Sequence, residues 1–444
     1  MKRLRLNKYT KVVENDKMII YDNCLYGSRM AVNKALKEQI DEYLERGVVP
    51  DEETKKVIAC LYKAKILSDA AMGIKTEEQE CLQQMANPET DLSTVYFMPT
   101  LTCNLRCVYC VIGTSVCGNE TERFMEKETI FETAEFIVRE AMKQNKKMLQ
   151  VLLFGGEPTM AIEQNAMLME RVNELVKTTD LQLQYVMITN GYNLKEKDVD
   201  RLIALGLTQI QITLDGPKEI HDKRRVNVGG NGTFEQIIEN MRMLKDKRVA
   251  ITIRVNVDQN NCDLIEDLLK YMYEEGFSER IYVQFAPVDP SDYSQSTGYE
   301  KETLEKFDRM YSVANEYGIP YGVWTRSCST NQDGQFAVAP NGDLYKCPLY
   351  VGKPEAVVGN VKAGLNDNSK KFRERQLRER CKKCEILPHC NGGCEPMREG
   401  AGLEDFCFKE ANETIVRTYL KNKYNKDYKD IAKERLSNVI DKFF

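Results

Sequence analysis

Three cysteines close together in the sequence are the residues best suited to do chemistry. Cys103, Cys107 and Cys110 are spaced as CxxxCxxC, directly after an apolar run at residues 95–98. Three thiolates on one short loop can hold three irons of a [4Fe–4S] cluster and leave the fourth iron open to another molecule. A zinc loop is the alternative, but structural zinc prefers four closed ligands paired as CxxC. The spacing therefore favours a cluster with one open iron.

A second motif follows about forty-five residues later. The apolar run at residues 149–154 ends in Gly155, Gly156, Glu157 and Pro158. Paired glycines after a buried strand let the backbone come close to a ligand, and Glu157 supplies an acceptor for an ammonium group. Together with the cysteine loop, this pattern closely resembles the radical S-adenosylmethionine (SAM) superfamily.

The resemblance implies an activity and a binding mode. The cluster would be held by Cys103, Cys107 and Cys110 and would donate one electron to SAM, which gives methionine and a 5′-deoxyadenosyl radical that abstracts hydrogen from a C–H bond. The Glu157 loop would hold the SAM amino group, and Tyr109, between the last two cysteines, would lie near adenine.

Two further strand ends resemble the same superfamily. Thr189 and Asn190 end one apolar run and are expected to contact the SAM ribose and carboxylate. Asp215 begins a stretch similar to the DGPxxxHDxxR pattern of one subgroup, in which the last arginine, here Arg225, approaches the SAM carboxylate. A surface charge is the alternative for Arg225. His221 is interpreted as a structural hydrogen-bonding residue.

The C-terminal third is rich in cysteine. Residues 328–347 follow a Cx13Gx4C pattern, residues 381–394 follow Cx2Cx5Cx3C, and Cys407 stands alone. Residues 336–338 and 343–345, with a Pro-Asn-Gly turn between them, predict a hairpin. The whole segment resembles the SPASM domain of radical SAM enzymes that act on peptides and proteins. A zinc ribbon at residues 381–394 would leave the other three cysteines unexplained.

The SPASM resemblance implies two auxiliary [4Fe–4S] clusters, hence three in all. The first would take Cys328, Cys347 and Cys394, and the second would take Cys381, Cys384, Cys390 and Cys407. The first set is one ligand short, so its fourth iron is open or is filled by Cys117, Cys262 or a substrate thiolate. The remaining cysteines are interpreted as small buried apolar residues: Cys24, Cys60 and Cys81.

One departure from a known subgroup bears on the substrate. Sulfatase-maturing relatives have a general-base aspartate directly after the cysteine that here is Cys347, whereas this chain has Pro348. That absence counts against sulfatase maturation, with Asp289 or Asp292 as alternative bases. Five residues are expected either to line the substrate cavity or to belong to the core: Leu153, Phe154, Tyr282, Gln284 and Trp324.

Composition agrees with a multidomain globular protein. The chain has 444 residues, of which 42% are hydrophobic, so two or three domains are expected. Its start has no apolar signal region, and no stretch reaches the length of a membrane span. Fifteen cysteines without an export signal favour metal clusters in the cytoplasm. The net charge of −5 and the lack of a basic aromatic patch predict no nucleic-acid partner.

Alternation of apolar runs with helical patterns predicts the fold class. Strands are expected at residues 95–99, 149–154, 181–188, 209–214, 250–257 and 281–286, with helices between them, including residues 131–143, 234–244 and 263–275. This βα order predicts an α/β protein with a partial (β/α)6 TIM barrel at residues 91–310, whose ligands bind at the carboxyl ends of the strands.

Three further segments flank the barrel. In residues 1–90, strands at 8–13, 18–22 and 24–27 and helices at 31–46, 51–64 and 76–85 resemble a winged-helix-like leader-recognition domain, with a simple capping domain as the alternative. Residues 311–408 are the expected cysteine-rich SPASM domain. Residues 409–444 form a charged helical tail that should pack on the protein itself.

These observations predict a radical SAM peptide maturase. It would bind a ribosomally made precursor peptide through its leader and install a crosslink in it, a thioether in preference to a carbon–carbon bond. An electron donor such as flavodoxin or ferredoxin is a further expected partner. A sulfatase-maturing-type protein oxidase is the alternative enzyme, and a multi-cluster electron-transfer protein is the non-enzyme alternative.

Overall fold

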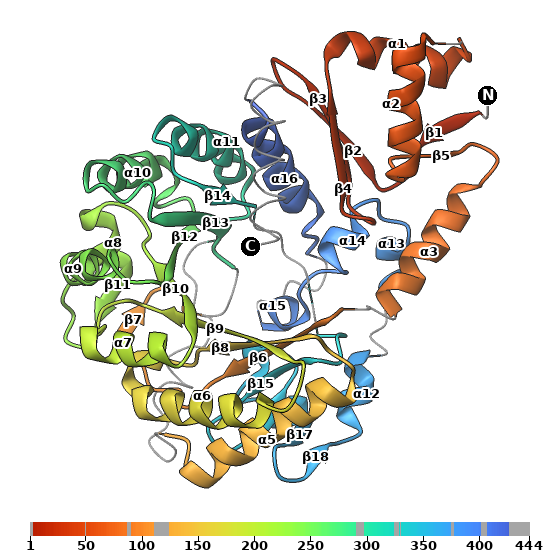
Figure 1. The fold of residues 1–444 in the computed structure, drawn as a ribbon. Coiled ribbons are helices and arrows are strands. Elements are labelled where there is room, and N and C mark those ends of the chain that lie inside the picture. Colours follow the sequence, from red (N-terminus) through yellow and green to blue (C-terminus); the bar gives the residue numbers. More distant parts are fainter. Residues whose placement is uncertain are drawn as a thin grey trace.

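Six parallel strands form the centre of the molecule and curve around an arc, with helices on their outer side (Figure 1). The structure is a computed structural model that describes residues 3–48, 50–86, 90–110, 124–289, 297–323, 328, 330–373, 377–400 and 406–425. All six predicted strands are confirmed, with ends shifted by no more than three residues. They are β6 (Leu92–Phe97), β8 (Met148–Leu153), β9 (Gln182–Thr189), β10 (Leu207–Thr213), β12 (Ala250–Val257) and β13 (Ile281–Pro287).

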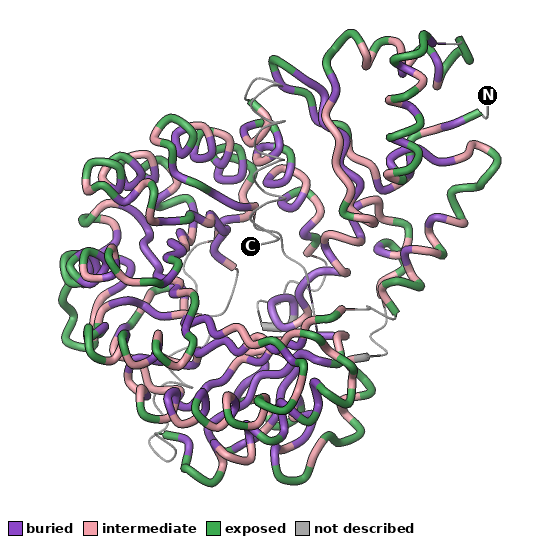
Figure 2. Tube along the Cα trace, in the orientation of Figure 1, coloured by how far each residue is buried: buried purple, intermediate pink, exposed green. Residues whose placement is uncertain are grey.

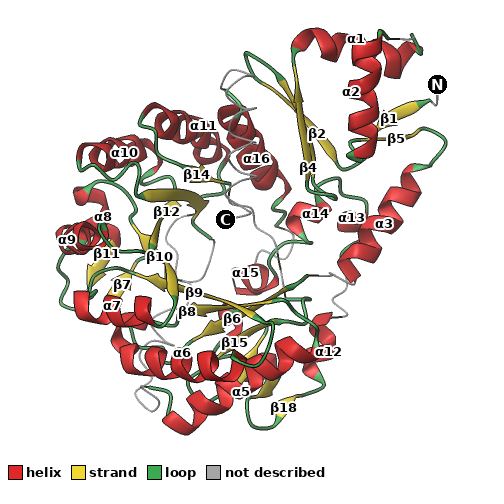
Figure 3. Cartoon of the chain, viewed as in Figure 1, coloured by secondary structure: helices red, strands yellow, loops and turns green. Residues whose placement is uncertain are grey.

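Each pair of neighbouring strands is parallel, in the order β6-β8-β9-β10-β12-β13. Helices follow the strands in turn, as the colouring by secondary structure shows (Figure 3). This confirms the predicted partial (β/α)6 barrel. The helices are α5 (Lys127–Lys143), α6 (Ile162–Val176), α7 (Glu196–Ala204), α9 (Phe234–Leu244), α10 (Ile265–Glu274) and α11 (Lys301–Glu316).

The main hydrophobic core lies between the strands and these outer helices. Val151, Ile212 and Ile253 point outward from their strands and pack with helix residues such as Phe136 and Leu268. Because side chains alternate along a strand, the residues between them face the barrel interior. Much of each of these strands is buried, as the colouring by burial shows (Figure 2).

The barrel sheet continues beyond the six strands at both edges. β14 (Tyr321–Gly322) pairs in parallel with β13, and β15 (Gln335–Val338) pairs in parallel with β6. β15 and β16 (Asp343–Tyr345) form the predicted hairpin, which is confirmed. β17 (Gly359–Asn360) and β18 (Gly364–Leu365) complete a sheet of eleven strands. The cysteine-rich segment therefore shares a sheet with the barrel, and the boundary expected at residues 310–311 falls within α11.

The N-terminal segment contains two small sheets and three helices. β2 (Thr10–Glu14), β3 (Ile19–Asn23) and β4 (Ser28–Val32) are antiparallel, and β1 (Leu4–Leu6) pairs with β5 (Leu67–Asp69), a pair that was not predicted. The three predicted helices are confirmed as α1 (Lys34–Arg46), α2 (Glu52–Lys63) and α3 (Ile74–Ala86).

The third predicted strand of this segment is wrong. Residues 24–27 form a turn, and the strand begins at Ser28. The Asn23 side chain accepts hydrogen bonds from the backbone N–H groups of Leu25 and Tyr26, and Gly27 has a φ of 63°. Asparagine and glycine stabilise a turn in this way, so the apolar character of the segment was misleading.

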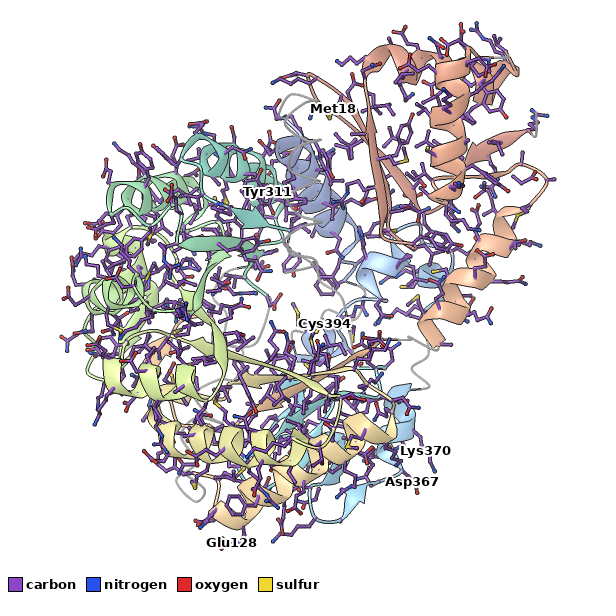
Figure 4. The ribbon with its side chains drawn as sticks, viewed as in Figure 1. Met18, Glu128, Tyr311, Asp367, Lys370 and Cys394 are labelled. Atoms are coloured by element: carbon purple, nitrogen blue, oxygen red, sulfur yellow. The ribbon has the colours of Figure 1, made fainter. Side chains whose placement is uncertain are left out.

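The three-stranded sheet is packed on both faces. Ile19 and Tyr21 face α1 and α2, while Val13, Met18 and Ile20 face α16 (Lys409–Lys423). Figure 4 shows Met18 at the end of this sheet beside α16. α16 also contacts α11, so it lies between the N-terminal sheet and the barrel. The predicted packing of the tail on the protein is confirmed for residues 409–425, and the rest of the tail lies outside the described residues.

Short helices carry the remaining C-terminal segment. They are α12 (Asn368–Arg373), α13 (Glu379–Lys382), α14 (Leu387–Cys390) and α15 (Glu395–Gly400). α15 lies on the inner side of the strand arc (Figure 1). Within the part of the chain that the structure describes, no helix is both long and apolar enough to cross a membrane.

Candidate active site

The loop that carries the first three cysteines leaves the carboxyl end of β6 and forms a short strand of its own. β7 (Leu105–Cys107) pairs antiparallel with β11 (Arg225–Asn227), and Cys107 lies opposite Arg225. Sequence analysis did not predict this ribbon. It holds the cysteine motif against the arginine motif that follows β10.

Cys103 and Cys110 lie close enough to Cys107 to change the pKa of its thiol. Burial raises the pKa of Cys107 to about 12, Arg225 lowers it, and Cys110 and Cys103 raise it further. Among the described residues, no three histidine, cysteine or acidic side chains are grouped tightly enough to bind one metal ion. Three thiolates are the number that holds a [4Fe–4S] cluster with one open iron, whereas structural zinc takes four closed ligands. The number of cysteines in this loop therefore fits a cluster.

Gly155 and Gly156 lie directly against the backbone that leads into Cys103. A Cβ atom on Gly156 would lie 2.3 Å from the carbonyl oxygens of Leu101 and Thr102. The N–H groups of Gly156 and Glu157 donate to the carbonyls of Thr100 and Thr102 at 3.0 and 2.9 Å. The close approach that was expected for a ligand is thus made to the cysteine loop, and it fixes the two motifs side by side.

The Glu157 carboxylate is fully buried at the centre of a hydrogen-bond network. Its Oε1 accepts from the N–H and hydroxyl of Thr159 and from the hydroxyl of Thr189, and its Oε2 accepts from the N–H of Asn190. Burial raises the pKa of Glu157, and these donors lower it. A carboxylate offers about four acceptor positions, and Oε2 retains capacity for a further donor.

Asn190 connects this network to the cysteines. Its Nδ2 donates to Oδ1 of Asn104 at 2.8 Å and lies 3.9 Å from Sγ of Cys103. Its Oδ1 accepts from the N–H of Tyr192 at 2.9 Å. Pro158 follows Glu157 and begins a short 3-10 turn, η1 (Pro158–Ala161). The expected SAM contacts Glu157, Thr189 and Asn190 are therefore adjacent to one another and to Cys103.

Tyr109, which belongs to the cysteine loop, lies in a second buried network. Its hydroxyl donates to the Asp215 carboxylate and accepts from Nη1 of Arg225 at 2.7 Å and from Nδ2 of Asn256 at 3.1 Å. The Arg224 guanidinium lies 5.0 Å from the centre of the Tyr109 ring. The surface-charge alternative for Arg225 is wrong, because its side chain is 5% exposed.

Arg224, the residue before Arg225, is equally buried. Its Nη1 pairs with Asp258 at 2.7 Å and its Nε lies 3.5 Å from Asp215. Burial disfavours the charged form of Arg224, and the two acids together with Tyr109 raise its pKa above the usual value. The two arginines therefore have different partners. Arg224 pairs with two aspartates, and Arg225 donates a hydrogen bond to Tyr109.

His221 is a structural residue, as predicted. Its Nδ1 accepts from the N–H of Asp215 at 3.4 Å, and its Nε2 lies 3.1 Å from the Thr233 hydroxyl, which donates to the Arg225 carbonyl at 2.7 Å. Burial, with help from Arg225, lowers the pKa of His221 to about 3. The imidazole is therefore neutral at physiological pH, and it holds Asp215 and Arg225 in place.

Three other C-terminal cysteines lie close enough to Cys390 to change the pKa of its thiol. Burial raises the pKa of Cys390 to about 12, and Cys407, Cys381 and Cys384 raise it further. These four are the set that the SPASM resemblance assigns to the second auxiliary cluster.

Two N-terminal cysteines lie beside this set. Cys24 and Cys81 share one hydrophobic cluster with Cys381 and Cys384, and the Cys24 thiol donates to the Glu385 carbonyl at 3.6 Å. Burial raises the pKa of both thiols, that of Cys24 to about 12. The prediction of a buried apolar role is confirmed for Cys81, which is fully buried.

The expected first auxiliary set lies nearer the barrel mouth. Cys347 packs in a cluster with Phe154, the residue before the glycine pair. The Cys328 carbonyl accepts a hydrogen bond from Asn391, three residues before Cys394. Figure 4 shows Cys394 on the inner side of the strand arc. Thus Cys347 lies near the carboxyl end of β8, and the loops that carry Cys328 and Cys394 are in contact with each other.

The described cysteines outside the motifs lie on other elements. Cys262 lies in η2 (Cys262–Leu264) and interacts with Thr303 and Lys306 of α11. Cys60 is exposed on α2, so its predicted burial is wrong. Cys117 lies outside the described residues.

Comparison with known proteins identifies the chemistry. Residues 97–272 match the Radical SAM superfamily. They form a radical SAM domain. It contains the cysteine loop, the Glu157 network and the Tyr109 network, and it implies a SAM-binding enzyme with a [4Fe–4S] cluster.

Curated relatives and solved structures differ in how much of this chain they match. The cysteine-type anaerobic sulfatase-maturating enzyme of Clostridium novyi is 29% identical and covers 67% of this chain and 86% of its own length. The radical SAM cyclopropyl synthase TigE of Paramaledivibacter caminithermalis is 22% identical and covers 88% of this chain and 90% of its own. SuiB of Streptococcus suis bound to its precursor peptide SuiA has the same fold, with a TM-score of 0.51, 14% identity and coverage of 88% and 96%.

The residues expected at the cavity lie on two different sides of the barrel strands. Leu153 faces the outer helices and belongs to the core. Phe154, Tyr282 and Gln284 lie on the opposite side of their strands, and Tyr282 is 43% exposed. Trp324 lies outside the described residues.

Of the two alternative bases, only Asp289 is described. It follows β13, and its Oδ1 accepts from the Tyr299 hydroxyl at 3.0 Å. Asp292 lies outside the described residues.

Sequence reasoning missed three residues of the Glu157 and Tyr109 networks. They are Thr159, which donates twice to Glu157, and Asn256 and Arg224, which contact Tyr109. Asn256 could have been found from its position near the carboxyl end of β12, because barrel strands place their functional residues there.

Proposed function

We propose that this radical SAM enzyme is a peptide maturase that installs an intramolecular crosslink in a ribosomally made precursor peptide. One observation carries the proposal. Residues 91–444 are 354 of the 444 residues, about 80% of the chain, so a match that covers 88% must extend into the N-terminal segment. TigE and SuiB, which match 88% of this chain, are a cyclopropyl synthase and a structure with a bound precursor peptide, whereas the sulfatase-maturating relatives of Clostridium novyi and Clostridium perfringens match 67% and 76%.

The N-terminal segment is the proposed leader-binding domain. Its three-stranded sheet has two edges, β2 and β4, and an extended leader would add as a further strand at one of them. A cleft of about 550 Å³ runs along β2 between α11, α14 and α16, and its lining includes Lys11, Val13, Leu304, His389 and Arg417. Binding the leader there would hold the core of the peptide near the barrel, so the reaction becomes effectively intramolecular.

The described networks suit SAM binding at the carboxyl ends of the strands. Oε2 of Glu157 and the adjoining loop of Gly155, Gly156 and Pro158 would receive the amino group, and Thr189 and Asn190 would receive the ribose and carboxylate. Arg225 would contribute its charge to the carboxylate, while Asp215 fixes the Tyr109 ring beside the adenine. When bound, SAM and its cluster supply the 5′-deoxyadenosyl radical that removes hydrogen from a C–H bond.

The C-terminal cysteines are proposed to hold two auxiliary [4Fe–4S] clusters, which makes three in total. The second has four cysteines, and the first, with Cys328, Cys347 and Cys394, has one position open. An open position that holds a substrate thiolate favours a thioether product, with a carbon–carbon crosslink next. The enzyme is proposed to act in the cytoplasm with a flavodoxin or ferredoxin as electron donor, because its clusters require a reducing compartment.

Mass spectrometry tests the proposed reaction. Anaerobically reconstituted enzyme is incubated with SAM, a reductant and a short cysteine-containing peptide encoded beside its gene. A product two hydrogens lighter that resists thiol alkylation supports a thioether, and the same mass loss with every thiol alkylatable indicates carbon–carbon coupling. Formation of deoxyadenosine with an unchanged peptide would contradict this substrate class.

Amide hydrogen exchange tests the leader site with the unaltered enzyme. Leader peptide without its core is added in trans to the full chain. Addition of a strand should slow exchange at the amides of one edge, β2 or β4, and leave α10 unchanged as an internal control. Equal exchange with and without the leader would argue for a capping role of this domain.

Sulfatase maturation is the second candidate function. The 29% identity to the Clostridium novyi enzyme favours it. Pro348, in place of the aspartate of that subgroup, counts against it, although Asp289 is positioned at the end of a barrel strand. To decide between the two candidate functions, the enzyme is incubated separately with the precursor peptide and with a sulfatase-derived peptide that contains the cysteine to be oxidised.

A further inference from the structure

Asn261 lies in the loop that follows β12, and its side chain joins the ends of two barrel strands. The residue is 1% exposed. Its Nδ2 donates to the carbonyl oxygens of Asp215 at 2.7 Å and of Asn256 at 2.8 Å. Its Oδ1 accepts from the N–H of Asp258 at 2.8 Å. The contacts to SAM that are expected from the sequence do not include Asn261.

The two carbonyls that Asn261 holds belong to neighbouring strands. Asp215 lies two residues beyond the end of β10, and Asn256 lies near the end of β12, which pairs in parallel with β10. The carboxamide uses both of its N–H donors in these bonds. Separation of the strand ends would leave buried polar groups without partners, which is unfavourable. Asn261 therefore fixes the spacing of the two strand ends.

The same two residues hold Tyr109. The Tyr109 hydroxyl donates to the Asp215 carboxylate and accepts from Nδ2 of Asn256 at 3.1 Å. The N–H of Asn256 donates to the Asp215 carboxylate at 3.1 Å, which ties the two partners to each other. The Tyr109 hydroxyl is thus held on one side by Arg225 and on the other by two residues whose carbonyls are bound by Asn261.

We infer that Asn261 is a positioning residue for SAM, which acts through Tyr109 and does not touch the cofactor. Asn261 sets the spacing of Asp215 and Asn256, and these two residues fix the Tyr109 hydroxyl. The ring that is proposed to lie beside adenine is then held in one orientation before SAM binds, so binding loses less conformational entropy. The inference rests on the proposed place of Tyr109 and is independent of the peptide substrate.

The alternative is a purely structural role, in which Asn261 only stabilises the loop after β12. The main chain of Asn261 also takes part in that loop, because its N–H donates to the Asp258 carbonyl at 3.2 Å and its carbonyl accepts from the N–H of Leu264 at 2.9 Å. Loss of the side chain lowers stability in both roles. Only the positioning role makes its effect on SAM affinity depend on the Tyr109 hydroxyl.

A double-mutant cycle measures this dependence. Asn261→Leu replaces the carboxamide with an apolar group of similar shape, and Tyr109→Phe removes only the hydroxyl. The dissociation constant of SAM is measured by equilibrium dialysis with the reconstituted, unreduced full chain. The wild type, both single variants and the double variant are compared. If Asn261→Leu does not fold, the milder Asn261→Ser takes its place in the same cycle.

Asn173→Leu is the matched control. Asn173 lies on α6, one of the outer helices, and its carboxamide also joins two elements. Its Nδ2 donates to the Leu205 carbonyl at 2.8 Å, and its Oδ1 accepts from the Tyr185 hydroxyl at 3.0 Å. Its replacement should lower stability and leave SAM affinity within about twofold of the wild type.

Each single variant, Asn261→Leu and Tyr109→Phe, should weaken SAM binding about 5- to 20-fold, and the double variant should lie within about twofold of Tyr109→Phe. Equal losses from Asn261→Leu in the two backgrounds, or no loss in either, would overturn the inference. Unchanged SAM affinity in Tyr109→Phe would overturn it together with the proposed place of Tyr109. Because no peptide is added, failure of the proposed crosslinking reaction would not alter these results.

Discussion

Cys107 and Arg225 are 118 positions apart in the sequence but face each other as a register pair of the ribbon formed by β7 and β11. The pairing sets a cation beside the Cys107 thiol and lets the same guanidinium reach the Tyr109 hydroxyl at 2.7 Å. One local ribbon therefore organises the cysteine loop, the ring expected at adenine and the residue expected at the SAM carboxylate.

Substitution of Arg224 and of Arg225 should have different effects, one on protein stability and the other on SAM affinity. Arg225→Gln removes the cation nearest the cysteine loop, and the dissociation constant of SAM should rise about tenfold or more. Arg224→Gln leaves Asp215 and Asp258 without their buried partner and should cost about 3–5 kcal/mol of unfolding free energy. Equilibrium binding of SAM and urea denaturation measure the two effects, and identical profiles for both variants would contradict this division.

Gly156→Ala should disrupt the first cluster. Its Cβ would overlap the carbonyl oxygens of Leu101 and Thr102, which are backbone atoms that cannot move without displacing Cys103. We expect loss of about four irons per chain, one cluster, and loss of SAM cleavage. Gly73→Ala is the control, because no atom lies within 4 Å of its added Cβ. Full iron content in Gly156→Ala would contradict this prediction, because it would show that the cluster forms even when the glycine loop and the cysteine loop are moved apart.

His221 should make the protein sensitive to acid. Its folded pKa of about 3 lies below the ordinary value of 6.5. Between these values the unfolded chain binds a proton that the folded chain does not, so unfolding free energy falls as pH drops, by up to about 1.4 kcal/mol per pH unit. Urea denaturation at pH 7, 6 and 5 should show a shallower decline in His221→Gln than in the wild type. Parallel declines would mean that His221 is not buried as a neutral ring.

The cysteines outside the motifs should differ from those within them. Cys384→Ser should lose about four irons, whereas Cys24→Ser and Cys81→Ser should retain all of them and lose only about 1–2 kcal/mol of stability, because a hydroxyl replaces a packed thiol. Cys60→Ser, at an exposed position, is the control for both measurements. Iron analysis and thermal unfolding measure these two effects. Loss of iron in Cys24→Ser would indicate that Cys24 is a cluster ligand.

The sequence by itself determined the barrel and its chemistry. Alternating apolar runs fixed six strands, because a strand packed under helices must be apolar on its outward face, and the spacing of Cys103, Cys107 and Cys110 limited the metal site. The Asp215 to Arg225 stretch also identified the arginine, although not its burial. Local patterns suffice for such features because the information lies within a few neighbouring residues.

Only the tertiary structure decided which distant segments meet. The pairing of β7 with β11, the joining of β15 to β6 and the packing of Cys24 and Cys81 beside Cys381 and Cys384 all depend on contacts between residues far apart in the chain. The wrongly placed third strand has a different, local cause, because Asn23 and Gly27 form a turn within an apolar segment. Apolar character says that a residue is buried, but the partner against which it is buried is set by the complete fold.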